Sequence, residues 1–503
     1  MMSFSLCVSR RRCAPRLASV LILLTTTTSC FGNRALPEVK ELVELPESYA
    51  RVESEKKGEE MPLEKVPLDR WCSDFGQPEL DALVEQAFES NLSLMASWAR
   101  LRQSEALLAQ TQSNLYPQVD LSATATRSKS PAFGGQNIPG QPSFFKNNFY
   151  RVEGSVSYEI DLWGKLAAQR EAAEYDYMAS RADVETAALS LTSSVAEAWF
   201  DVLAQQQKDL LISEQIELNE RYVALLELRF QQGSSSVLDI NQQRQQIQGL
   251  KAQQRTARQQ RMLALQRLAT LVGKAPDDTE ALAAQIDALL LPELTSLPEA
   301  GVPADLLERR PDLRAAHYRL ESANKKIAVA VRDRLPTLRL SLSTFLQALD
   351  IKNLLNDFFW SVGAAASQPL VDGGRRKQEV KRAEAVQDEA YYAYGNTLLT
   401  ALTEVQTAIV SEHYQALFIE DLEEQYRLAD TSLTLSRESY SRGRFDFLRV
   451  LTSLQALQQV EQNLIDARRR RLGHRLQLCR ALGGSWTTEV QAPATPPENQ
   501  SDS

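Results

Sequence analysis

The chain has 503 residues, of which 43% are hydrophobic and 24% charged, and it contains only 20 Gly and 20 Pro. This balance excludes a disordered chain, and so few Gly and Pro exclude an architecture of many short strands joined by turns. The formal net charge of −9 argues against a nucleic-acid-binding protein, because such proteins meet the phosphates with a basic surface.

The first 29 residues have the order of a secretory signal peptide. A basic segment with four arginines precedes the apolar residues 17–24, and TTTTS then leads to Cys30. Eight apolar residues are too few to cross a bilayer as a helix, so we expect residues 1–29 to be removed. Their loss changes the formal net charge from −9 to −13. The residues before Cys30 resemble a lipobox, which predicts acylation of Cys30, although Thr27 stands where Leu is usual. Ordinary cleavage that leaves a lone thiol is the alternative.

The rest of the chain contains two copies of one sequence unit. Similar residues recur 219 positions apart in the early part of each copy, as Pro117 and Pro336 do. Later in each copy the spacing is 210, as between Gly233 and Gly443. These constant offsets predict an internal duplication. The change of offset places nine extra residues of copy one in a Gly- and Pro-containing loop between Pro117 and Gly164.

Each copy is expected to begin with a helix that runs into a proline, over residues 81–114 and 311–334. Two segments with alternating apolar residues follow in each copy, at 119–125, 150–160, 338–342 and 358–366. Alternation with a period of two predicts strands that have one apolar face. Their length of about ten residues fits the tilted strands of outer-membrane barrels.

A long helical hairpin is predicted to follow the strands. Residues 166–231 contain neither Pro nor Gly, which predicts a helix of about 100 Å at about 1.5 Å per residue. The chain then reverses at residues 233–236, and in copy two at 442–444. The returning helix has a coiled-coil seam, formed by Ile240, Ile247, Leu250, Ala257, Ala264, Leu268 and Leu271. The residues 210 positions later are apolar at every seam position except His474.

Four membrane strands cannot be stable alone, because an open sheet edge in lipid leaves backbone groups without hydrogen bonds. Bacterial single-chain barrels begin at about eight strands, so the sheet has to be completed by other chains. Three copies supply twelve strands. We therefore predict a mostly α fold with a trimeric twelve-stranded β-barrel, four strands per chain, whose cylinder the long helices continue below the membrane.

Four motifs in this order resemble the TolC/OprM/NodT family of outer-membrane efflux lipoproteins. They are WCSDFGQPELDAL at 71–83, YEIDLWGK at 158–165, VPADLLERRPDL at 302–313 and QPLVDGGR at 368–375. The resemblance extends over about residues 70–486. It implies a homotrimeric, passive exit duct for drugs, metals or other toxic solutes, joined through a periplasmic adaptor protein to an inner-membrane pump. It further implies that the long helices form a long α-helical barrel in the periplasm. A type I protein secretion duct and a periplasmic coiled-coil scaffold without a pore remain alternatives.

The expected organisation follows from these observations. Residues 1–29 are the signal peptide, and 30–70 form an extended linker after the lipidated cysteine. The first repeat covers 71–290 and the second 302–485, and 486–503 form a flexible tail. The resemblance places the protein in the outer membrane, in contact with its lipid and extending into the periplasm.

The resemblance also implies that the two helix reversals are periplasmic tips that contact the adaptor. The contact residues are then Arg229, Phe230, Gly233, Ser234, Ser236, Leu238, Asp239, Tyr440, Gly443 and Phe445. A plain hairpin turn without a partner is the alternative. The candidate gate consists of Arg442, Arg444, Asp446, Leu448 and Arg449, where a three-fold axis would repeat opposed charges. Thr452 stands where the family often has Asp, and solvated helix charges are an equal alternative.

No catalytic residue, cofactor or metal site is predicted. The three histidines, at 317, 413 and 474, are too far apart in the sequence for a zinc motif. The arginines at 468–471 predict a solvated helix face rather than a nucleic-acid contact. Cys72 and Cys479 could pair in an oxidising compartment, but two buried thiols are the favoured prediction. Trp360 and the adjacent Phe358 and Phe359 are candidates for an aromatic belt at the membrane interface.

Overall fold

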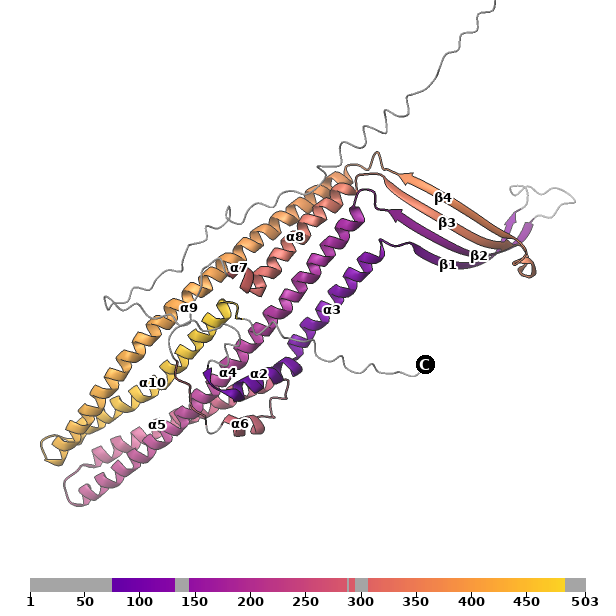
Figure 1. Cartoon of the computed structure of the whole chain (residues 1–503). Helices are drawn as coiled ribbons and strands as arrows, with labels where there is room; N and C mark the ends of the chain where they lie inside the picture. The colour runs from indigo at the N-terminus through magenta and orange to yellow at the C-terminus, as the bar shows by residue number, and fades with distance from the viewer. Residues whose placement is uncertain (1–74, 132–143, 287–288, 295–305, 485–503) are drawn as a thin grey trace, which may run out of the picture. The chain divides into compact units, whose positions relative to one another are not determined.

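The computed structural model describes residues 75–131, 144–286, 289–294 and 306–484 (Figure 1). The signal peptide, Cys30, the linker over 30–70, Cys72 and the tail over 486–503 lie outside the described residues. The described chain divides into two compact units. The first unit comprises 105–131, 144–177 and 319–391, and the second comprises the remaining described residues.

The first unit contains one antiparallel sheet with the strand order β1-β2-β3-β4. Its strands are β1 (Gln118–Pro131), β2 (Phe144–Ile160), β3 (Thr337–Ala348) and β4 (Phe358–Ser367). The four predicted strands are therefore confirmed. Within the described chain β1 pairs only with β2 and β4 only with β3, so both are edge strands. Both are exposed along their whole length.

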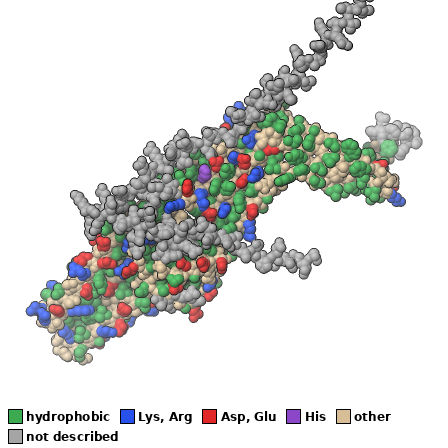
Figure 2. Space-filling view, viewed as in Figure 1, with side chains coloured by type: hydrophobic (Ala, Val, Ile, Leu, Met, Phe, Trp, Pro, Cys, Tyr) green, Lys and Arg blue, Asp and Glu red, His purple; other side chains and the backbone are tan. Residues whose placement is uncertain are grey.

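Apolar side chains are concentrated over this sheet, whereas charged side chains lie mainly over the helices (Figure 2). Val119 and Leu121 on β1 are 75% and 81% exposed, and Trp360 and Val362 on β4 are 68% and 71% exposed. A soluble surface rarely carries so much contiguous apolar area. This distribution is that of a sheet whose apolar face contacts lipid or another chain.

The helices of copy one are α2 (Pro78–Ser90), α3 (Leu92–Ser113), α4 (Lys165–Gln231), α5 (Val237–Leu271) and α6 (Glu280–Ile286). The prediction of a single helix over 81–114 is wrong, because the chain breaks at Asn91. Asn91 is extended (φ −70°, ψ 116°) and its Oδ1 accepts a hydrogen bond from the Leu94 N–H at 3.0 Å. Its amide also donates to the Leu271 carbonyl at 2.9 Å. This side chain satisfies the Leu94 N–H in the first turn of α3, as an N-cap does.

The helices of copy two are α7 (Leu306–Arg309), α8 (Pro311–Arg332), α9 (Arg375–Ser441) and α10 (Phe447–Ala481), with a short 3₁₀ turn η5 (Ile351–Asn353) before β4. Helices α3 and α8 have 22 residues each and begin 219 positions apart. Helices α4 and α9 have 67 residues each, α5 and α10 have 35 each, and both pairs are offset by 210. The offsets read from the sequence are thus reproduced element by element, which confirms the duplication.

The second unit is held together by apolar side chains of the hairpin helices. Trp199, Phe200 and Leu203 on α4 are completely buried. The Trp199 indole donates to the Gln77 side-chain oxygen, and the Phe75 and Phe200 rings meet edge to face at 5.1 Å. The predicted seam is also confirmed, since most of its positions on α5 and α10 are buried. His474, the seam position that is not apolar, is half-buried.

Candidate functional site: the two helix reversals

Both reversals have the same backbone geometry. Gly233 and Gly443 each have a φ of 71°, in the left-handed region that favours glycine. The Ser234 N–H donates to the Arg229 carbonyl at 2.8 Å, and the Arg444 N–H to the Ser439 carbonyl at 2.9 Å. Each bond spans five residues and closes the end of the preceding helix, as in a Schellman motif. The two glycines are therefore needed to end α4 and α9.

The returning helices start differently in the two copies. The Ser236 hydroxyl accepts from the Asp239 N–H at 3.2 Å, and the Asp239 carboxylate accepts from the Ser236 N–H at 3.0 Å. This capping box stabilises α5 by about 1 kcal/mol. Asp446 occupies the N-cap position of α10, but its side chain accepts no capping hydrogen bond. The Asp446 carboxylate thus makes no capping hydrogen bond to its own helix, whereas that of Asp239 does.

Aromatic side chains connect the two reversals within the second unit. The Arg229 guanidinium lies over the Tyr440 ring, 4.5 Å from its centroid, a contact worth about 0.5–1 kcal/mol at an exposed site. The buried Phe447 ring lies 5.6 Å from Tyr440 and 6.3 Å from Tyr222. Arg229 of the first repeat and Tyr440 of the second, both predicted as tip residues, are therefore in contact within one chain.

Sequence reasoning missed Phe447, which is at the centre of this contact. Phe447, Val450, Leu454 and Leu457 follow one another at steps of 3, 4 and 3 and share one buried cluster with Leu226 and Ile240. The signal was therefore present, since Phe447 extends the seam by one step towards the turn.

Most of the other predicted tip and gate residues are exposed. Four are large and apolar: Phe230, Leu238, Phe445 and Leu448 are 45%, 64%, 44% and 46% exposed. Arg449 lies over the Phe445 ring at 4.3 Å, and Arg442 pairs with Glu438 at 3.5 Å. Ser234, Ser236, Gly443, Arg444 and Asp446 are also exposed. Exposed apolar side chains among charges are typical of a surface that binds another protein.

A buried layer of amide side chains lies further along the same hairpins. Gln215 on α4 donates to the Glu461 carboxylate at 2.8 Å and accepts from Gln462 on α10 at 3.0 Å. Gln243 on α5 donates to Asn219 on α4 at 2.6 Å, and both are completely buried. Burial raises the pKa of Glu461, and the hydrogen bond from Gln215 opposes that rise. The hydrogen bonds of these amides join α4 to α5 and α10, which favours one alignment of the helices.

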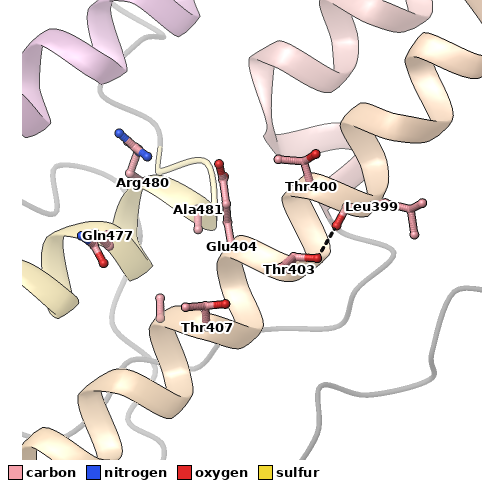
Figure 3. A pocket seen from close by; sticks show the side chains of 9 residues that line it. Leu399, Thr400, Thr403, Glu404, Thr407, Gln477, Arg480 and Ala481 are labelled. Carbon is pink, nitrogen blue, oxygen red and sulfur yellow. Dashed lines mark hydrogen bonds between the residues drawn. The ribbon is translucent and has the colours of Figure 1, made fainter.

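A groove of about 360 Å³ lies between α9 and α10 (Figure 3). Thr400, Thr403 and Thr407 line one side along α9, and Gln477 and Arg480 on α10 line the other. The Thr400 and Thr403 hydroxyls donate to the Asn396 and Leu399 carbonyls of their own helix, at 2.9 and 2.8 Å. The hydroxyl donors of these two threonines are therefore already used within α9.

The remaining candidate groups have structural partners. His317 lies against Tyr394, with ring centroids 5.9 Å apart, and His413 against Tyr414. Arg468 and Arg469 pair with Glu423 and Asp201, so part of the predicted solvated face is bound to α4. Cys479 on α10 is buried. Among the described residues no group of His, Cys, Asp and Glu has the arrangement of a metal site. No helix in the described ranges combines the length and apolar character needed to cross a membrane.

Comparison with known proteins gives the family. The model of the family described as outer membrane efflux protein matches residues 83–274 and 302–484, one segment in each copy. The pyoverdine export outer membrane protein OpmQ of Pseudomonas putida is 29% identical over 428 residues, which cover 84% of this chain and 90% of that protein. The toluene efflux pump outer membrane protein TtgF of Pseudomonas putida is 26% identical over 460 residues, covering 89% and 92%.

Solved structures show the same fold. The outer-membrane channel OprN has 25% identity, a TM-score of 0.77, and coverage of 90% of this chain and 99% of that chain. The outer membrane protein VceC of Vibrio cholerae has 26% identity, a TM-score of 0.74, and coverage of 83% and 99%. The chain therefore belongs to the outer membrane efflux protein family and is an outer-membrane efflux channel rather than an enzyme.

Proposed function

We propose that the chain works as a lipid-anchored homotrimer that forms a passive exit duct. The observation that carries this proposal is the pair of open edges, β1 and β4, on a sheet of only four strands. An open strand edge cannot persist in lipid, so other copies of the whole chain have to supply the missing strand pairing. Three copies give twelve strands, an even number as in other bacterial barrels. The anchor is the acylated Cys30.

The cargo that we propose is a small toxic or exported solute. This inference rests on the relatives, which are named for pyoverdine export and for toluene efflux. Protein export would need the same duct beside a different pump. Expressing the chain in a strain that lacks its own outer-membrane efflux channels tests the proposal. Restored resistance, with heat-resistant trimers in the outer-membrane fraction, is the expected result, and a monomer in detergent without restored efflux would contradict it.

We propose that the periplasmic adaptor binds at the two helix reversals. The adaptor then connects the channel to the inner-membrane pump. The exposed Phe230, Leu238 and Phe445 provide apolar contact area beside the glycine turns. Arginines outnumber acids on this surface, with Arg229, Arg442 and Arg444 beside Asp239 and Asp446. A partner tip with apolar and acidic side chains fits such a surface better than a basic one.

Replacing Gly233 or Gly443 by valine should impair coupling to the adaptor while leaving membrane insertion intact. A Cβ at either position has no atom within 4 Å, so the expected cost is local strain at a φ of 71°, not a clash. Resistance in the efflux-deficient strain should fall several-fold, while the amount of trimer in the outer membrane stays near wild type. Gly249, inside α5 and also with open space around it, provides the control as Gly249→Ala. Normal efflux in both valine variants would exclude the tip assignment.

We assign the gate to the charged residues of the second reversal. Asp446 is the one acid among Arg442, Arg444 and Arg449, and it does not cap its own helix. We infer that its carboxylate pairs with an arginine of a neighbouring copy and holds the tips together. Exposed pairs contribute only about 0–1 kcal/mol each, which suits a latch that must open.

Asp446→Ala should therefore raise the single-channel conductance of the protein in planar bilayers. The matched control is Asp239→Ala, which removes an acid at the equivalent turn of copy one but acts on the capping box. An unchanged conductance for Asp446→Ala would place the latch elsewhere.

A further inference from the structure

The sheet of the first unit has two chemically different faces. Residues paired across the strands lie on the same face, and successive residues of one strand lie on opposite faces. The apolar face is built from rows such as Val119, Val156, Leu342 and Val362. The opposite face is built from rows such as Asp120, Ser155, Ser343 and Ser361. In a sheet that spans a membrane, the apolar face is the one that contacts the hydrocarbon of the lipid.

Strands β1 and β2 continue beyond the other two strands. The last row that they share with β3 consists of Ala125, Tyr150 and Ala348. Beyond it, residues 126–131 of β1 pair only with residues 144–149 of β2 among the described residues. This extension is about 20 Å long at about 3.4 Å per residue. The chain enters β1 from α3 and leaves β2 towards α4, so the extension lies at the opposite end of the strands (Figure 1).

On this extension the apolar face becomes basic. Arg127 and Lys129 follow Ala125 at steps of two residues, and Lys146 is the direct partner of Lys129. All three side chains are exposed, and within the described ranges none of them pairs with an acid. Residues 121–152 contain four Lys and Arg but neither Asp nor Glu. The end of the β1–β2 hairpin therefore has a positive charge that its own chain does not compensate.

The pair Lys129–Lys146 is unfavourable in an isolated hairpin, because like charges directly opposite each other destabilise a sheet. The Lys129 Nζ lies over the Phe144 ring, 4.2 Å from its centroid, on the same face. An anionic group placed between the two ammonium groups would remove their repulsion and accept hydrogen bonds from both. Copy two lacks this feature, since the segment between β3 and β4 has one cation and two acids, at 352, 350 and 357.

We propose that Arg127, Lys129 and Lys146 bind the phosphate groups of the glycolipid in the outer leaflet of the outer membrane. The rows up to Tyr150 fit the hydrocarbon, and an amphipathic tyrosine suits the boundary with the headgroups. The next rows then lie at headgroup depth, where the lipid carries its negative charge. This inference goes beyond the exit duct and requires only that the sheet spans the membrane with its helices on the periplasmic side. It does not depend on the number of copies.

Binding of diphosphoryl lipid A to the purified full-length protein in detergent, measured by microscale thermophoresis, tests this site. Lys129→Gln/Lys146→Gln should raise the dissociation constant by about tenfold or more, because two cations near the headgroup are lost. The matched control is Arg339→Gln/Lys352→Gln, which removes two exposed cations of copy two and should leave the constant within about twofold of wild type. Equal effects of the two double variants would overturn the site, as would displacement of the lipid by millimolar inorganic phosphate.

A charge reversal separates binding from a purely structural role. Lys146→Glu places an acid opposite Lys129, so the unfolding temperature in lipid-free detergent should not fall, while the affinity for diphosphoryl lipid A should fall at least as far as in the double glutamine variant. An unchanged lipid affinity in Lys146→Glu would overturn the proposal. The glutamine variant should still restore resistance in the efflux-deficient strain. A wild-type protein that binds the lipid but restores no resistance would contradict the duct and support this site.

Discussion

Replacing Glu412 with alanine should lower the free energy of unfolding by about 3–5 kcal/mol, because it removes the buried carboxylate that pairs with the Arg475 guanidinium. The two Glu412 oxygens accept from the Arg475 Nε at 2.8 and 3.0 Å. The side chains are 1% and 9% exposed, so water cannot replace the lost partner. Burial also lowers the pKa of the nearby Arg471, a sign of how unfavourable a cation is at this place.

Chemical denaturation followed by circular dichroism measures the change. The matched control is Glu424→Ala, which breaks an ion pair of similar length with Arg427 on an exposed face of α9 and should leave the transition unchanged. A second variant, Glu412→Leu with Arg475→Met, removes both charges and should recover most of the loss. A loss in Glu412→Ala no larger than in Glu424→Ala would mean that the buried pair contributes nothing.

Gly273→Ala should destabilise the protein by roughly 2–5 kcal/mol, although Gly233→Ala at nearly the same φ should cost only about 1 kcal/mol. The φ values are 72° and 71°, so the backbone strain is the same. A Cβ on Gly273 would lie 2.4 Å from the Ser90 carbonyl oxygen and 2.9 Å from its carbon, whereas one on Gly233 meets nothing within 4 Å. The clash at Gly273 is with backbone, which cannot rotate away.

Ser90 is itself held at this contact, since its hydroxyl donates to the Val272 carbonyl at 2.7 Å. The end of α5 and the end of α2 therefore have to separate if residue 273 acquires a side chain. Unfolding of the two alanine variants under the same conditions distinguishes strain from clash. Equal losses of unfolding free energy in the two variants would show that the backbone of Ser90 can move away from residue 273.

Local and periodic features of this protein were predictable from its sequence. Similar residues recur at offsets of 219 and 210, and the strands and the seam on α5 and α10 show regular apolar spacing. A single sequence, without an alignment of relatives, is enough to reveal these patterns. The glycine turns at 233 and 443 were predictable for the same reason, because a reversal between two long helices needs a left-handed residue. The proposal that further copies of the chain complete the sheet also rests on counting strands.

Four features could be recognised only in the folded structure. They are the break at Asn91, the burial of Phe447, the amide layer around Gln215 and the close approach at Gly273. Each depends on residues far apart in the sequence, such as Asn91 with Leu271 or Gln215 with Gln462. Spacing along one helix shows which face is apolar, but not which distant backbone group a side chain will meet. Those partners are set by packing between helices, where a single buried hydrogen bond or a single close contact determines the local structure.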